Sequence, residues 1–150
     1  MKILAISGSL RAGSHNTDLL QAAAAVAPDG IDIMLYDGLK EIPPYDADDD
    51  FPGAQPALVH RFKEALVEAD AVLIATPEYN SSIPGVLKNA LDWASRPLAE
   101  SPVRNKPVAV PKADQRLANG VDATLLDELR TVVDALATAV EARDQTRAAA

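Results

Sequence analysis

The chain contains no cysteine among its 150 residues. Disulfide bonds, thiolate zinc sites and cysteine nucleophiles are therefore excluded. Long apolar runs are also missing. The first, Ile3 to Ile6, is too short for the core of a signal peptide, and no stretch approaches the roughly 20 residues that span a bilayer. We therefore expect a cytoplasmic protein with no membrane partner.

Positive charge is scarce. The chain has 14 Lys and Arg against 22 Asp and Glu, which gives a net charge of −8. This balance argues against nucleic acid as a partner, although it leaves room for a locally positive pocket. The length and the hydrophobic fraction of 48% are typical of one globular domain, which we expect to cover residues 1–150.

Metal-ligand patterns are missing as well. The acidic run at 46–50 lacks the glycine and the distant glutamate of a calcium loop. His15 and His60 have no zinc-ligand spacing. We expect no metal site.

Apolar strands alternate with helical patterns along the chain. Strands that are apolar throughout and separated by helices predict a parallel sheet covered on both faces. We therefore predict an α/β fold, a flavodoxin-like three-layer sandwich with strand order 2-1-3-4. The expected strands are 2–7, 31–36, 71–76 and 107–110. The expected helices are 17–27, 57–68, 84–94 and 123–141, followed by a frayed tail at about 142–150.

The loop after the first strand, from Gly8 to Asn16, carries glycines, hydroxyls and one arginine just before a helix. It lacks the lysine of a nucleoside-triphosphate loop, because Ser14-His15 stands in its place. It also lacks the dinucleotide fingerprint, because Leu10 replaces its second glycine. The remaining groups suit a single phosphate at a helix N-terminus, and the alternative is a plain capped turn. The candidate phosphate ligands are Ser9, Arg11, Ser14 and Asn16.

The loop after the third strand, from Thr76 to Pro84, is longer than a helix cap requires. Ser82 is the expected N-cap, and Pro84 suits the first helical turn. In open parallel sheets, ligands bind beyond the carboxyl ends of the strands where the strand order reverses. The loops after strands one and three flank that point, so we expect this loop to carry binding residues.

Two segments together resemble the NADPH-dependent FMN reductase family. They are Gly8-Ser-Leu-Arg-x-Gly-Ser-x-Asn16 and Pro77-Glu-Tyr-Asn-x-Ser-Ile-Pro-Gly-x-Leu-Lys-Asn-Ala-Leu-Asp-Trp93. The resemblance implies a flavodoxin-like fold, FMN as cofactor, NADPH or NADH as electron donor, a quinone or similar small molecule as acceptor, and a homodimer or homotetramer. It also implies that Ser9, Arg11, Ser14 and Asn16 hold the flavin phosphate. Pro77, Glu78, Tyr79 and Asn80 are then expected along the isoalloxazine edge.

The resemblance is interrupted after Val110. Members of the family continue into a third flavin-contacting loop, a crossover helix and a fifth strand, whereas here Val110 leads directly into Pro111. This pattern indicates an internal deletion, so the fourth strand is expected to form a sheet edge and FMN affinity is expected to fall. A reductase is the first hypothesis, with no side chain assigned as acid or base. The alternatives are a non-catalytic phosphate-binding or oligomerising remnant of the family and a flavodoxin-like electron carrier.

Overall fold

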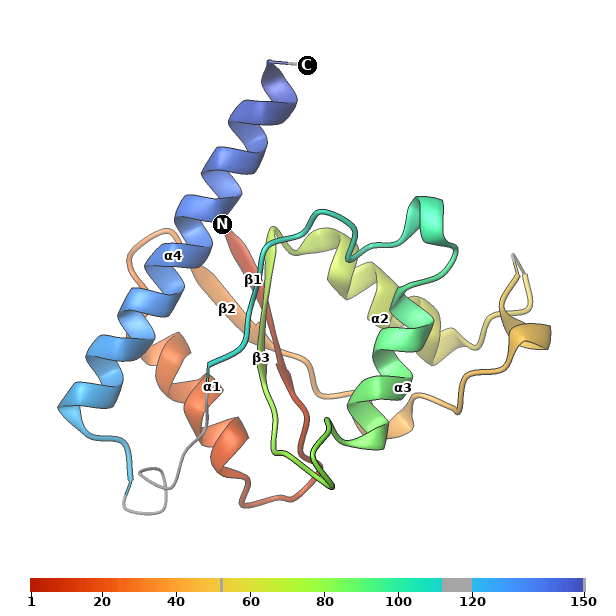
Figure 1. Ribbon diagram of the computed structural model, residues 1–150, viewed down its shortest axis with the longest axis horizontal. Helices are drawn as coiled ribbons and strands as arrows, with labels where there is room; N and C mark the ends of the chain where they lie inside the picture. The colour runs from red at the N-terminus through yellow and green to blue at the C-terminus, as the bar shows by residue number, and fades with distance from the viewer. Residues whose placement is uncertain (52, 112–119, 150) are drawn as a thin grey trace.

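The computed structural model describes residues 1–51, 53–111 and 120–149. Its centre is a parallel sheet of four strands in the order β2-β1-β3-β4 (Figure 1), as predicted. The strands are β1 (Lys2–Ser7), β2 (Asp32–Leu35), β3 (Ala71–Ala75) and β4 (Val108–Ala109). The two central strands, β1 and β3, are almost wholly buried, which explains their unbroken apolar sequences.

Four helices cover the two faces of the sheet, so the predicted three-layer sandwich is confirmed. Helices α1 and α4 lie on one face, and α2 and α3 lie on the other (Figure 1). Successive side chains of a strand point to opposite faces, so Ile3 packs against the first pair and Leu4 against the second. The helices are α1 (His15–Ala25), α2 (Ala57–Glu68), α3 (Gly85–Ala94) and α4 (Ala123–Ala148), with short 3-10 turns η1 (Leu39–Glu41), η2 (Ala47–Asp49) and η3 (Leu98–Glu100).

The last helix extends beyond the predicted boundary. The segment from 142 was expected to fray, yet α4 continues to Ala148. Alanine-rich sequence has high helix propensity, and Arg143 fixes this end because its Nη1 donates to the carbonyl of Asp70 at 2.8 Å. This is a long-range contact that the sequence pattern could not reveal.

Strand β4 is short and lies at the edge of the sheet, as predicted. Its two residues pair with Val72 and Leu73 of β3. In the described part of the chain, no fifth strand follows it. The outer backbone groups of β4 therefore lack the neighbour expected of a central strand.

No helix within the described ranges is both long enough and apolar enough to cross a membrane.

Candidate functional site

The loops after β1 and β3 meet at the carboxyl edge of the sheet, where the strand order reverses. The backbone N–H of Gly8 donates to the carbonyl of Ala75 at 2.8 Å. A Cβ on Gly8 would lie 2.3 Å from Oγ1 of Thr76, so only glycine lets the two loops approach this closely. The structure thus brings together the two segments that the sequence marked as candidate binding loops.

The first loop ends in a capped helix. Ser14 is the N-cap of α1, and its Oγ accepts the backbone N–H of Asn16 at 3.2 Å. Both residues are buried. Within the described residues, the buried Oδ1 of Asn16 has no hydrogen-bond partner. The capped turn that we considered as an alternative to a phosphate site is therefore present. It also contains the Asn16 Oδ1, a buried polar atom that has no partner among the described residues.

The groups before this cap are free to bind an anion. The guanidinium of Arg11 is exposed and contacts no acceptor among the residues described, and the backbone N–H groups of Ala12, Gly13 and His15 are likewise unpaired there. Ser9 is half-buried, and its Oγ accepts the backbone N–H of Arg11 at 3.4 Å. Unpaired N–H groups at a helix N-terminus with an unpaired arginine make a site of positive potential in an acidic protein.

The second loop forms a tight turn that sequence reasoning missed. Tyr79 and Ser82 exchange two backbone hydrogen bonds of 2.8 and 3.0 Å, and Asn80 and Ser81 both have left-handed backbones with φ of 51° and 60°. A non-glycine residue in this conformation costs about 1–2 kcal/mol. Ser82 is therefore not the helix N-cap, contrary to our prediction: Pro84 occupies that position, and α3 begins at Gly85. The preference of asparagine for this conformation was the available signal.

A cavity of about 390 Å³ lies beside this turn. Pro77 and Glu78 line it, as do Ser81 and Ser82, which the sequence analysis did not select. Tyr79 and Asn80 do not line it and are exposed. The opposite wall is formed by Val110 and Pro111, the residues at which the family resemblance is interrupted.

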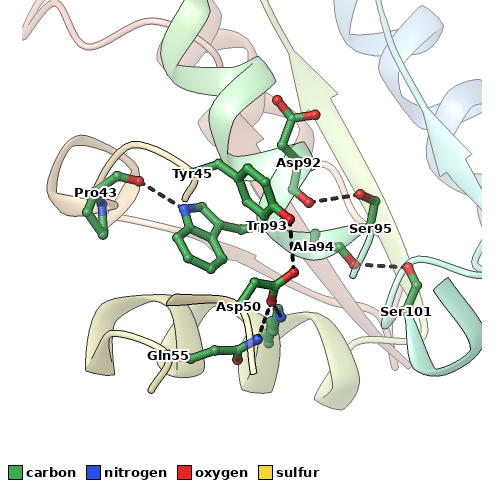
Figure 2. A network of polar contacts seen from close by, with 10 residues as sticks. Pro43, Tyr45, Asp50, Gln55, Asp92, Trp93, Ala94, Ser95 and Ser101 are labelled. Atoms are coloured by element: carbon green, nitrogen blue, oxygen red, sulfur yellow. Dashed lines mark hydrogen bonds and ion pairs between the residues drawn. The ribbon is translucent and has the colours of Figure 1, made fainter. Parts of the chain in front are cut away.

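Helix α3, which carries this loop at its N-terminal end, is fixed to the segment after β2 by a polar network (Figure 2). The Nε1 of Trp93 donates to the carbonyl of Pro43 at 2.9 Å, and the ring of Trp93 contacts that of Tyr45 edge-on at 4.9 Å between centroids. Asn89, one turn earlier, accepts the backbone N–H of Tyr45 at 2.7 Å and donates to Pro43 at 2.8 Å. These contacts hold α3 in place, and Trp93 is a buried core residue.

The same network contains a buried ion pair. Asp50 accepts hydrogen bonds from the hydroxyl of Tyr45 at 3.2 Å and from Nε2 of Gln55 at 2.6 Å, and its Oδ1 lies 3.7 Å from Nζ of Lys63. Burial lowers the pKa of Lys63, and the Asp50 carboxylate opposes that shift. The acidic segment 46–50 is thus anchored at its last residue.

Comparison with known proteins agrees with this arrangement. A family model for NADPH-dependent FMN reductase matches residues 1–146. The chain belongs to this family. An NAD(P)H-dependent FMN reductase of Pseudomonas aeruginosa is 53% identical over 110 residues, which cover 73% of this chain and 58% of that protein. A quinone reductase of Escherichia coli is 38% identical over 120 residues, which cover 80% of this chain and 63% of that protein.

Solved structures share the fold. The flavoenzyme NAD(P)H:(acceptor) oxidoreductase FerB of Paracoccus denitrificans superposes with a TM-score of 0.79 and 28% identity, covering 95% of this chain and 98% of that one. The chain spans about three fifths of the length of the curated relatives it matches.

Proposed function

We propose that this chain binds FMN and transfers hydride from NADPH or NADH to a quinone or a similar small acceptor. The observation that carries the proposal is the unpaired Arg11 guanidinium beside the capped N-terminus of α1, directly next to the loop after β3. Membership of the FMN reductase family and the names of the relatives supply the cofactor and the substrate class.

The first loop fits a flavin phosphate. A phosphate needs positive charge and several N–H or O–H donors, and the loop offers Arg11 together with the free backbone N–H groups before α1. Ser14 fixes the backbone that presents these donors. The unpaired Oδ1 of Asn16 can accept a hydrogen bond from a ligand hydroxyl, such as one on the ribityl chain. We propose that Ser9, Arg11, Ser14 and Asn16 together form the phosphate site.

The second loop fits the flavin ring. When bound, FMN supplies the hydride chemistry, and the protein contributes position and electrostatics. The backbone N–H groups of Glu78, Asn80 and Ser81 have no partner among the described residues, so they are available as donors to a ring that gains negative charge. We propose that Pro77 and Glu78 border the ring within the 390 Å³ cavity. Tyr79 and Asn80 act through the turn that shapes this edge.

The exposed aromatic side chain beside this cavity is consistent with an oligomeric reductase. Tyr79 is 56% exposed at the start of the turn, where a second subunit would cover it. We propose a homodimer or homotetramer, which the mass of the protein in solution will test.

A second candidate function follows from the short fourth strand. Because Val110 leads directly into Pro111 beside the cavity, nothing in the described part of the chain supplies the family's third flavin loop. A chain without that third loop would retain the phosphate site and lose catalysis. It would then be a phosphate-binding or oligomerising remnant of the family.

The experiment is a titration of the purified chain with FMN and, separately, with riboflavin, which lacks the phosphate. We expect FMN to bind, and we expect Arg11→Ala to weaken FMN at least about tenfold while leaving riboflavin unchanged, since a charge-assisted hydrogen-bond pair is lost. Arg130→Ala on α4 is the matched control, because among the described residues Arg130 pairs only with Asp127.

The second part of the experiment mixes NADPH, FMN-loaded protein and a quinone. Steady oxidation of NADPH supports the reductase. FMN binding without turnover favours the remnant or a one-electron carrier. A chain that stays colourless in excess FMN would refute the cofactor assignment.

A further inference from the structure

An apolar groove of about 310 Å³ lies along the free edge of β4, between that strand and α4. Val132, Ala135 and Ala139, spaced three and four residues apart on one face of α4, line it from the helix, and residues 107–109 line it from the strand. Every described residue that borders the groove is apolar. None of them lines the cavity that we propose for the flavin ring.

The backbone of β4 faces its neighbour and the free edge in alternation. The carbonyl of Pro107 accepts the backbone N–H of Val72 at 2.9 Å, so the backbone groups of Pro107 face β3. Successive residues of a strand present these groups to opposite sides, so those of Ala109 also face β3, and those of Val108 and Val110 face outward. The outward groups have no partner among the described residues. The free edge therefore carries two donor–acceptor pairs, one at each valine.

This pattern is complementary to itself. In an antiparallel pair of strands, opposite residues can exchange both of their backbone hydrogen bonds. If Ala109 lies opposite Ala109 of a second copy, Val108 of each copy lies opposite Val110 of the other, and every outward N–H is paired. A register with Val108 opposite itself would place Val110 opposite Lys106, whose N–H already donates to the carbonyl of Val103 at 3.2 Å.

The side chains at this edge suit the same register. Ala109 lies on the α4 side of the sheet, where two copies in a non-hydrogen-bonded pair would approach to about 4.5 Å between Cα atoms, a distance that suits small side chains. Val108 and Val110 are 48% and 58% exposed, and each would pack on a valine of the second copy. Charge does not oppose the contact, because residues 107–111 carry none in a chain of net charge −8.

We propose that β4 pairs with β4 of a second copy of this chain, antiparallel and centred on Ala109, so that the two sheets become one continuous sheet. The self-complementary hydrogen-bonding pattern and the uncharged edge identify the occupant as a second copy. Two strands this short form a contact smaller than the roughly 1,200–2,000 Å² of a stable interface, so we expect a weak dimer that forms at high protein concentration. The contact requires neither FMN nor the surface at Tyr79.

The first test uses cysteine, which the chain lacks. In the proposed register the two Cα atoms at position 109 lie about 4.5 Å apart, so Ala109→Cys is expected to give a disulfide-linked dimer under mild oxidation. Val108→Cys lies diagonally across from its copy, at about 7–8 Å, and is expected to cross-link at least about tenfold more slowly. Ala24→Cys, exposed on α1, is the control and is expected to remain unlinked.

The second test removes an outward donor without removing a hydrogen bond to β3. Val108→Pro deletes one N–H from each copy, and therefore two of the interstrand hydrogen bonds, so we expect the dimer to weaken about tenfold in sedimentation equilibrium. Val108→Ile keeps the donor and is expected to associate within about twofold of the unsubstituted chain. Thermal unfolding verifies that both variants are folded.

Cross-linking at position 109, with weaker association of Val108→Pro, supports the proposal. It is overturned if Ala109→Cys stays unlinked at the highest soluble concentration, if Val108→Cys links as fast, or if folded Val108→Pro associates as strongly as the unsubstituted chain. A peptide of residues 106–111, Lys-Pro-Val-Ala-Val-Pro, tests the other occupant. If the unsubstituted chain binds this peptide while Ala109→Cys stays unlinked, the edge accepts strands of other proteins and the second copy is excluded.

Discussion

Gly8 and Thr76 lie so close together that only glycine fits at position 8, because a Cβ there would come within 2.3 Å of Oγ1 and 2.8 Å of Cβ of Thr76. The two loops that form the candidate site are therefore joined at their bases by backbone contact. The distance between the phosphate loop and the cavity beside β3 depends on this contact.

Replacement of Gly8 by alanine is expected to separate the loops. The added methyl group meets Oγ1 and Cβ of Thr76, so we expect a loss of about 2 kcal/mol in the free energy of unfolding, as in other overpacked cores. Gly13→Ala is the matched control within the same loop, because nothing lies within 4 Å of the position its Cβ would take. Urea denaturation of both variants measures the difference. Equal stability of the two would contradict the close approach.

Removal of the Asp50 carboxylate is expected to destabilise the segment after β2. Asp50→Asn leaves the mostly buried ammonium of Lys63 without its partner, and we expect a cost of about 3 kcal/mol. The double variant D50N/K63M removes both charges and is expected to recover part of that loss. Asp49→Asn, in the exposed stretch beside it, should have little effect. If the double variant were no more stable than D50N, an unpaired Lys63 would not be the cause.

Stability is expected to depend on pH through Lys106. Burial lowers the pKa of this lysine, and Arg143 and Arg147 add to the shift, although Asp70 opposes it. The folded chain then releases the proton at a lower pH than the unfolded chain does. The free energy of unfolding therefore rises with pH between the folded-state pKa and the ordinary lysine value near 10.5.

Lys106→Met removes that contribution, so the stability of the unsubstituted chain relative to K106M should increase as the pH rises toward the ordinary lysine value near 10.5. Burial also raises the pKa values of Tyr36 and Tyr45, which gives the opposite slope at higher pH. Both tyrosines are present in each protein, so their effect cancels in the difference. A difference that stays constant with pH would show that Lys106 titrates normally in the folded chain.

Strand β4 is expected to mediate self-association. Val108 is 48% exposed on an edge beside which the described residues place no further strand. Val108→Lys places a charge on this edge, which opposes strand addition while changing the free energy of unfolding by less than about 0.5 kcal/mol. Sedimentation velocity over a range of concentrations should show less association in the variant. If association were unchanged, another surface of the protein would mediate it.

Local signals were sufficient for most of the fold. The apolar runs of β1 and β3 identified central strands because a strand buried on both faces must be apolar on both. The edge position of β4 followed from the absence of residues for a further crossover. Boundaries were less certain: the Ser14 cap starts α1 two residues before the predicted start, and Arg143 holds α4 together past the predicted end.

The site shows a similar division. Ser9, Arg11, Ser14 and Asn16 could be selected from the sequence because anion-binding loops have a recognisable composition before a helix. The turn at Asn80 and Ser81 and the buried, unpaired hydroxyl of Tyr36 in the described part of the chain could not be selected. Each depends on where backbone and side chains meet in space, which residue spacing does not encode.

By itself, the sequence determined the parallel α/β sheet, its strand order and the two loops at its carboxyl edge, because apolar periodicity and glycine-rich turns are local properties of the chain. Only the tertiary structure decided which groups remain without a partner among the described residues: the Arg11 guanidinium, the Asn16 oxygen and the Tyr36 hydroxyl. The physical reason is that hydrogen bonding and burial depend on contacts between distant segments. A polar atom is known to need a ligand only after every neighbouring segment has been placed around it.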